Sequence, residues 1–463
     1  QSFDTGSYVI NLNQPAKRLI RTLMDADVPM DESFIEEQER RRAKDLPGDI
    51  YDVTAWSLPL MLNVESVACS RRIGVDTTPA SPEFVKPGRV IGGEASVAYL
   101  VPWGEATATR FLANALRQGL SVKSSDRPFT NNGNRYPSGT LIIDVADNPG
   151  AFDRIRFLAI TTGATVVAVN DSWVTDGPNF GSGNVVRHRA PAVAIAWDRP
   201  TSAYSAGNTR FVIERQFDYP VTPIRTRNIQ SSDLSNYDVL ILPESWGSYE
   251  NALGEAGAEN LKGWVENGGV LIAVGSANRY VANAGFDIAA LRREDAAIDS
   301  DDEDNGSKKG GDDDEERPTV AGSLLESDDD YEAAITPERE SPDSVGGVLV
   351  RATVDADHWL GAGVAETINV LVRGPDIYAP VTRDKGTNVA RFVAADDLLA
   401  SGYLWEENRR QLAFKPFAVV EERGRGFIVS FTQDPNVRAY LDGLNVIFMN
   451  AIFRGSAHAR PLP

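Results

Sequence analysis

Cysteine and histidine are scarce in this sequence. It contains one cysteine, Cys69, and three histidines, His188, His358 and His458. A single cysteine excludes an internal disulfide and any metal site built on a Cys-x-x-Cys pair, and it leaves the cellular compartment open. We interpret Cys69 as a structural thiol rather than a reactive one.

Long apolar runs are also absent. No stretch approaches the ~18 apolar residues of a membrane-spanning helix, so the sequence predicts no membrane span. The hydrophobic fraction of 42% is ordinary for a globular protein, and 463 residues are enough for two or three domains.

The net charge of −20 makes nucleic acid an unfavourable partner. Most of the negative charge lies in one segment. Residues 294–343 hold 20 acidic and 4 basic residues and so carry −16 of the total. Low hydrophobicity with high charge predicts a surface loop without a packed core. A sharper alternative is a calcium loop, because oxygen-bearing side chains recur with nearly the spacing of an EF-hand, although neither flank is predicted to be helical. The candidate ligands are Asp301, Glu303, Asn305 and Asp312.

The region from Pro191 to Ala284 has the pattern of a parallel sheet. Short apolar runs, long enough for buried strands, alternate with stretches of helical periodicity. The predicted strands are residues 192–197, 238–243 and 270–274. Helices predicted at 208–217 and 258–267 would cover the sheet. This alternation predicts a flavodoxin-like, doubly wound α/β domain.

Ligand sites in such sheets lie beyond the carboxyl ends of the strands, here at loops 198–207, 243–249 and 275–279. Two segments at these loops carry a resemblance. Tyr237-Asp-Val-Leu-Ile-Leu-Pro-Glu244 and Gly268-Gly-Val-Leu-Ile-Ala-Val-Gly-Ser276 resemble the class I glutamine amidotransferase fold. The resemblance implies an oxyanion-hole glycine in the second loop and, in the third, a nucleophilic cysteine activated by a distant histidine.

The sequence lacks both parts of that machinery. Glu244 stands where the resemblance places the glycine, and its carboxylate would repel a developing oxyanion. Gly275-Ser276-Ala277 stands where the cysteine would be, and no histidine follows at the usual distance. We therefore expect the amidotransferase reaction to be absent.

The same edge of the sheet provides a candidate binding cleft. Tyr204, Glu244 and Ser276 are expected to line it, with His358 as a further candidate. We expect these side chains to bind a ligand rather than to catalyse. A serine hydrolase is a weaker alternative, in which Ser276 at a strand-to-helix turn would pair with His358. The Gly-x-Ser-x-Gly signature of a nucleophile elbow is missing.

A second, smaller α/β domain is predicted upstream, at residues 95–188. Its predicted strands are residues 97–101, 140–145 and 165–169, and its predicted helices are 107–118 and 149–162. Together the two regions predict two doubly wound domains with mainly parallel sheets. The glycine-rich loop 176–184 lacks the spacing and the lysine of a phosphate loop, so we interpret it as a turn between domains rather than an anion cradle.

The first sixty residues are predicted to hold helices at 15–24 and 31–44. Gly6-Ser-Tyr-Val-Ile10, Gln14-Pro15 and Tyr51-Asp-Val-Thr-Ala-Trp-Ser-Leu-Pro59 resemble the stretch that follows the catalytic domain in a group of large bacterial zinc carboxypeptidases. The resemblance covers nearly the whole chain. It implies a segment 1–63 after a peptidase domain outside this sequence, a linker 64–94, a domain 95–188 and an amidotransferase-like domain 189–456 with an acidic insertion 294–345.

This resemblance implies a non-catalytic accessory or substrate-docking role in a zinc carboxypeptidase. Such an enzyme holds zinc with His-x-x-Glu and a later histidine, but the residues three places after the histidines here are Pro191, Gly361 and Pro461. We expect no cofactor in this chain and zinc only in the peptidase domain. Expected partners are that domain and peptide substrates, in the periplasm or outside the cell. The alternative is a free-standing, degenerate amidotransferase-like module that binds a small ligand.

Overall fold

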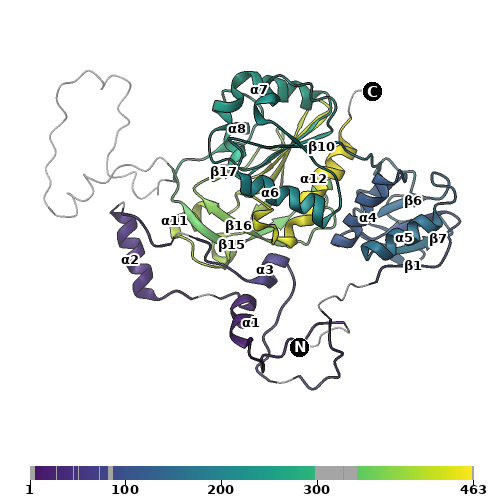
Figure 1. Ribbon diagram of the computed structural model, residues 1–463, viewed down its shortest axis with the longest axis horizontal. Helices are drawn as coiled ribbons and strands as arrows, with labels where there is room; N and C mark the ends of the chain where they lie inside the picture. The colour runs from purple at the N-terminus through teal and green to yellow at the C-terminus, as the bar shows by residue number, and fades with distance from the viewer. Residues whose placement is uncertain are drawn as a thin grey trace.

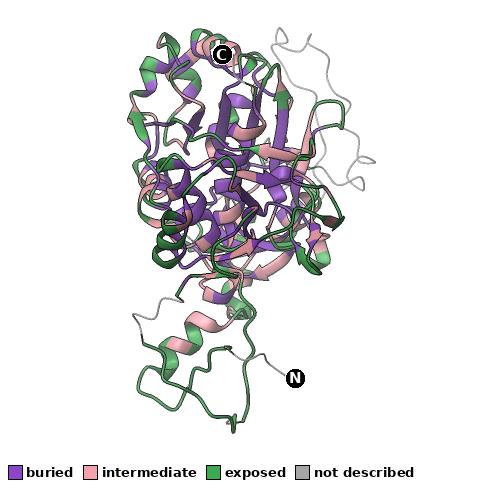
Figure 2. Cartoon of the chain, turned by 90° about the vertical axis from the view of Figure 1, so that its right-hand side faces the viewer, coloured by how far each residue is buried: buried purple, intermediate pink, exposed green. Residues whose placement is uncertain are grey.

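The computed structural model describes residues 6–27, 29–44, 46–50, 52–71, 73–81, 87–297, 327 and 341–460. These residues form a smaller and a larger α/β domain side by side, with an N-terminal segment along the larger one (Figure 1). Buried residues concentrate in the domains, whereas most of the N-terminal segment is exposed (Figure 2). No described helix has the length and apolar character needed to cross a membrane.

The larger domain is built on one mixed sheet, which has ten strands in the described part of the chain. One half is parallel, with adjacent strands in the order β11, β10, β12, β13 and β21. These strands are β10 (Val193–Ala196), β11 (Thr222–Ile224), β12 (Val239–Leu242), β13 (Val270–Val274) and β21 (Gly426–Phe431). The other half is antiparallel and comprises β15 (Val345–Val354), β16 (Thr367–Gly374), β18 (Thr387–Phe392), β19 (Leu399–Ser401) and β20 (Pro416–Arg423).

Both faces of the parallel half are buried. Along β12, Val239 and Ile241 belong to one apolar cluster and Leu240 and Leu242 to another, because successive side chains of a strand point to opposite faces. The first face is covered by α6 (Ala203–Phe211), the short π-helix η1 (Val212–Gln216) and α12 (Asn445–His458). The second face is covered by α7 (Tyr249–Glu266) and α8 (Asn278–Val281).

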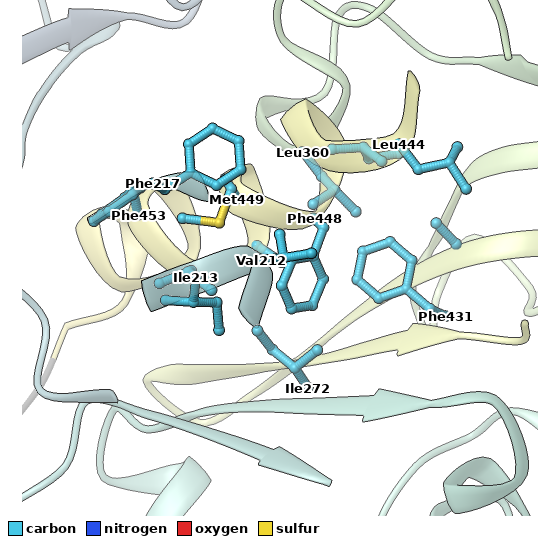
Figure 3. Packing of buried hydrophobic residues seen from close by; sticks show 14 of the residues in the cluster. Val212, Ile213, Phe217, Ile272, Leu360, Phe431, Leu444, Phe448, Met449 and Phe453 are labelled. Carbon is cyan, nitrogen blue, oxygen red and sulfur yellow. The ribbon is translucent and has the colours of Figure 1, made fainter. Parts of the chain in front are cut away.

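Helix α12 packs on the first face of the sheet. Phe448 and Met449 of α12 lie with Val212 and Ile213 of η1 above Ile272 of β13 (Figure 3). Together they close the first face over the centre of the parallel strands. This half of the domain confirms the predicted alternation of buried strands and amphipathic helices.

The smaller domain differs from the prediction. Its sheet runs in the order β1-β7-β2-β6-β3-β9, and only β1 and β7 are parallel. The strands are β1 (Arg89–Ile91), β2 (Ala98–Val101), β3 (Lys123–Ser125), β6 (Leu141–Asp144), β7 (Thr165–Val169) and β9 (Val185–Arg187). The expectation of a mainly parallel sheet was therefore wrong for this domain, because apolar runs mark buried strands but do not encode their direction. Strand β1 lies inside the predicted linker 64–94.

The small domain is also not doubly wound. Its helices α4 (Ala106–Arg117) and α5 (Phe152–Thr162) contact each other and pack on one face. A three-stranded sheet covers the other face, with Phe129, Tyr136 and Phe180 in the core between the two sheets. Its strands are β4 (Phe129–Asn131), β5 (Asn134–Tyr136) and β8 (Val174–Asp176).

Shorter elements complete the described chain. In the N-terminal segment they are α1 (Lys17–Met24), α2 (Glu32–Ala43) and α3 (Leu58–Leu62), of which the first two lie where the sequence predicts helices. In the larger domain they are η2 (Thr226–Gln230), η3 (Gly275–Ala277), β14 (Arg292–Arg293), η6 (Trp359–Gly361), β17 (Tyr378–Ala379), α10 (Ala395–Leu398), α11 (Glu406–Leu412), η7 (Val437–Ala439) and η8 (Asp442–Leu444).

Buried polar groups join the two domains. Arg454 of α12 is fully buried and donates from Nη2 to Oδ1 of Asp126 at 2.6 Å and from Nη1 to Oγ of Ser124 at 3.0 Å. Nε2 of His458 lies 3.0 Å from the other oxygen of Asp126, and Nδ1 of His188 lies 3.3 Å from the carbonyl oxygen of Phe453 on α12. The interface is therefore held by charged and polar side chains as well as by apolar packing.

Candidate functional site

Gly275 forms the turn at which β13 ends. Its φ angle is +53°, in the left-handed region that favours glycine. In a nucleophile elbow, the attacking residue sits on such a strained strand-to-helix turn. A Cβ atom at Gly275 would lie 2.5 Å from Oε1 and 3.0 Å from Cδ of Glu244. The Glu244 carboxyl group therefore fills the space into which a side chain at this turn would project.

Glu244 is held in this place by a polar cluster. Nη2 of Arg373, at the end of β16, donates to Oε2 of Glu244 at 3.0 Å, and the Glu244 side chain is 23% exposed. Asp434, which follows β21, is buried and accepts from Oγ of Ser205 at 2.7 Å. Burial raises the pKa of Glu244 to about 7, with the Asp434 charge adding to the rise and Arg373 opposing it. Two neighbouring carboxyl groups make this turn unfavourable for an oxyanion.

The backbone amides beside the turn are occupied as well. The N–H of Glu244 donates to Oγ of Ser205 at 3.1 Å, and the N–H of Ser245 donates to Oγ of Ser276 at 2.9 Å. The Ser276 hydroxyl in turn donates to the carbonyl of Ser245 at 3.2 Å. Ser276 therefore ties its loop to the loop after β12, and neither amide is left to bind an oxyanion.

The structure places His358 at the other end of the sheet. Nδ1 of His358 accepts from the N–H of Leu360, and its ring contacts Trp359. Trp359 in turn contacts the ring of Phe427. Phe427 lies near the start of β21 and pairs with Val270 at the start of β13. A five-residue strand such as β13 spans roughly 13 Å, so His358 and the turn after this strand are well apart. The pairing of Ser276 with His358 that the weaker serine-hydrolase alternative requires is therefore not formed in this structure.

Tyr204 lies on the exposed rim of the same edge. Its side chain is 74% exposed, and its ring meets the ring of Trp246, which is 68% exposed, at a centroid distance of 5.3 Å and an angle of 74°. The backbone N–H of Trp246 donates to the carbonyl of Pro200 at 3.1 Å. Of the predicted cleft residues, Glu244 and Ser276 thus lie in the inner cluster and Tyr204 outside it.

A groove runs beside Trp246 at this edge. It consists of two adjoining hollows of about 730 Å³ and about 400 Å³ that share Arg199 and Arg227 as lining residues. We call it the arginine groove. The larger hollow is also lined by Trp246, Gln230, Ser248 and Asn251, and the smaller by Asp198, Arg225 and Asn228.

The groove is fixed by internal hydrogen bonds. Thr201, which lines it and is buried, has its Oγ1 2.8 Å from the hydroxyl of Tyr249 and 3.2 Å from Oγ1 of Thr226. Nε2 of Gln230 donates to the carbonyls of Ala252 and Leu253, which ties η2 to α7. The groove is therefore a preformed feature of the strand ends.

Two other sequence candidates fall elsewhere. The calcium candidates Asp301, Glu303, Asn305 and Asp312 lie outside the described residues. In the glycine-rich loop 176–184, a Cβ at Gly177 would lie 2.3 Å from the carbonyl oxygen of Pro128, so close packing explains that glycine. Within the ranges given above, no group of three or more histidine, cysteine, aspartate or glutamate side chains is arranged to hold a metal ion.

Several residues of this edge were not predicted. Arg373 lies at the end of β16 and Asp434 in the loop after β21. Arg199 lies in the loop after β10, and Arg227 lies in η2, which follows β11. Only Arg373 directly follows an apolar run, so the four residues share no local signal in the sequence. They can be recognised as neighbours only once the order of the strands is known, since the order decides which loops meet.

No protein family and no curated protein matches the sequence. Several solved structures are similar in fold. A ThuA-like protein from Parabacteroides merdae is 11% identical, with 59% of this chain and 92% of that chain covered and a TM-score of 0.35. A glutamine amidotransferase from Thermotoga maritima is 8% identical, with 57% and 97% covered and a TM-score of 0.34. A β-galactosidase from Bacillus circulans is 14% identical, with 57% and 31% covered and a TM-score of 0.29.

These values describe a distant likeness. The chain is an α/β protein with mixed sheets and has distant structural similarity to class I glutamine amidotransferase-like and ThuA-like domains.

Proposed function

We propose that this chain is a non-catalytic docking region of a zinc carboxypeptidase, joined to a peptidase domain outside this sequence. The observation that carries the proposal is the turn at Gly275, where the carboxyl group of Glu244 takes the place of an attacking side chain. The amides of Glu244 and Ser245 are both used within the fold. A scaffold without an attacking group is suited to binding, and the sequence resemblance supplies the parent enzyme.

The N-terminal segment gives further support. It is fixed to the larger domain at Thr54, whose N–H and Oγ1 both donate to the carbonyl of Gly347, at 2.8 Å and 2.9 Å. Arg42 adds ion pairs to Asp343 and Glu407, each at 2.9 Å. The segment is thus anchored to the larger domain of the chain.

The part of the segment before this anchor exposes apolar side chains. Helix α1 buries none of its residues, and its Leu19 is 62% exposed. Tyr8, Val9, Ile10 and Leu12 are 72%, 49%, 51% and 46% exposed. Exposed apolar side chains that gather in one short segment of the chain favour a protein interface. In the proposed parent, this surface would face the peptidase domain.

The test needs the coding sequence upstream of Gln1. We expect it to encode His-x-x-Glu and a later histidine. The peptidase domain made from it should bind this chain saturably in a calorimetric titration, and this chain alone should not hydrolyse peptides. The double variant Ile10→Asp/Leu19→Asp should weaken binding at least tenfold, because each aspartate would be desolvated at the interface.

The matched control is Phe157→Asp/Ile160→Asp on α5. These side chains are 60% and 56% exposed and lie on the smaller domain, so this variant should bind as the unchanged chain does. Peptide hydrolysis by the chain alone, or no association with the peptidase domain, would contradict the proposal.

A free-standing ligand-binding module is the second candidate, and the arginine groove favours it. Its experiment is a thermal-shift screen, because a ligand that binds only the folded state raises the unfolding midpoint. A flat screen together with binding to the peptidase domain would exclude this second candidate.

A further inference from the structure

The arginine groove is locally positive in a negative protein. The chain carries −20 overall, yet the groove is lined by Arg199, Arg225 and Arg227 and by one carboxylate, Asp198. Nη1 of Arg225 lies 3.0 Å from Oδ2 of Asp198, so this pair is internally neutralised. Two positive charges remain, and a local field of that sign attracts anions.

Arg199 and Arg227 carry those two charges. Both are exposed, and neither has an ion-pair partner in the described part of the chain. Both line the larger hollow, where Trp246 lies as well. Two unpaired guanidinium groups that line the same hollow can bind one carboxylate with charge-assisted hydrogen bonds.

The aromatic pair provides the apolar part of the site. The rings of Tyr204 and Trp246 meet edge to face, and the backbone N–H of Trp246 donates a hydrogen bond to the carbonyl of Pro200. The indole is therefore supported while 68% of the residue stays exposed beside the groove. An exposed, supported tryptophan is a typical anchor for a ligand side chain or backbone.

We propose that the arginine groove binds acidic peptides, with a carboxylate held between Arg199 and Arg227 and the neighbouring residue packed on Trp246. A peptide fits better than a free phosphate because Trp246 offers an apolar surface beside the arginines that an inorganic ion would leave unused. The inference rests on the proposed docking role and names the substrate class that this role would serve.

The probe is a fluorescein-labelled hexapeptide that contains two glutamates, and its affinity for the full chain is read by fluorescence anisotropy. The counterpart with glutamines and an amidated end should bind at least tenfold more weakly, because it offers no carboxylate. Arg199→Gln/Arg227→Gln should weaken binding of the acidic peptide about tenfold, and Trp246→Ala about fivefold. Raised salt should weaken it further.

Matched variants separate the groove from general effects. Arg135→Gln/Arg383→Gln changes the net charge equally at exposed positions outside the groove, and Trp173→Ala removes a tryptophan that is 71% exposed elsewhere. Both should leave the affinity unchanged. Equal binding of the acidic and neutral peptides, equal loss in the control variants, or full competition by inorganic phosphate at the peptide's concentration would overturn the proposal.

The proposed docking role and the assignment of the arginine groove can be tested separately. Association with the peptidase domain is measured with the same groove variants, and they should bind it as the unchanged chain does, because the groove lies on the larger domain's strand ends and α1 does not. Loss of peptide binding with intact association rejects only the groove assignment. Absence of association rejects the docking role whatever the peptide does.

Discussion

Replacing Arg454 by methionine should lower the free energy of unfolding by about 3–5 kcal/mol. The guanidinium is fully buried between the two domains and donates to Asp126, Ser124 and the carbonyl of Trp359. Its removal leaves Asp126 without its principal cation and two acceptors without donors, and that desolvation cost dominates. Equilibrium unfolding in urea, followed by circular dichroism, measures the loss.

Arg127→Met is the matched control. Nη1 of Arg127 lies 2.6 Å from Oδ1 of Asp357, also across the two domains, but these side chains are 50% and 77% exposed. Exposed pairs contribute about 0–1 kcal/mol, so this variant should lose no more than that. In addition, Asp126→Asn should cost less in the Arg454→Met background than in the unchanged chain. Equal losses for Arg454→Met and Arg127→Met would contradict the account of the interface.

Acid should destabilise the fold through His188. Burial lowers the pKa of His188 to about 3, with the charges of Arg454 and His458 acting in the same direction. In the unfolded chain the His188 ring takes up a proton near pH 6.5, whereas in the folded chain this ring stays neutral at that pH. The stabilisation is therefore complete above that pH and is lost as pH falls, by about 1.4 kcal/mol per pH unit.

The comparison with His188→Gln isolates this contribution. Between about pH 7 and about pH 5 the unchanged chain should lose about 2 kcal/mol more than the variant. His358, whose pKa burial lowers to about 4, adds a similar loss to both proteins. Glu244 contributes a pH dependence of the opposite sign to that of the two histidines. Because its pKa in the folded chain is raised, its contribution to stability is present at low pH and is lost as pH rises towards about 7. Parallel pH profiles for the two proteins would refute the role of His188.

The sequence predicted the centre of the larger domain because its strands are buried on both faces. The runs 238–243 and 270–274 are apolar at nearly every position, and they form β12 and β13. The direction of β2 and β6 in the smaller domain was not predictable in this way. A buried antiparallel strand has the same apolar run, and tertiary pairing decides its direction.

The site was predictable only in part. Glu244 and Ser276 directly follow strands or lie in their turns, so the carboxyl-end rule found them. Arg373 and Asp434 follow the acidic insertion in the sequence, whereas Glu244 precedes it. No local sequence pattern indicates that these three side chains meet. His188, His358 and His458 lie at or beside one domain interface, although nothing in their sequence neighbourhoods relates them.

The most direct measurement asks whether this edge of the sheet still holds an attacking atom. The full chain is incubated with a fluorophosphonate, and its intact mass is then determined. We expect no mass increase, because the space beside Gly275 is filled by Glu244 and the Ser276 hydroxyl is bonded to Ser245. A stoichiometric adduct on Ser276 would show that an activated nucleophile is present and would contradict the account.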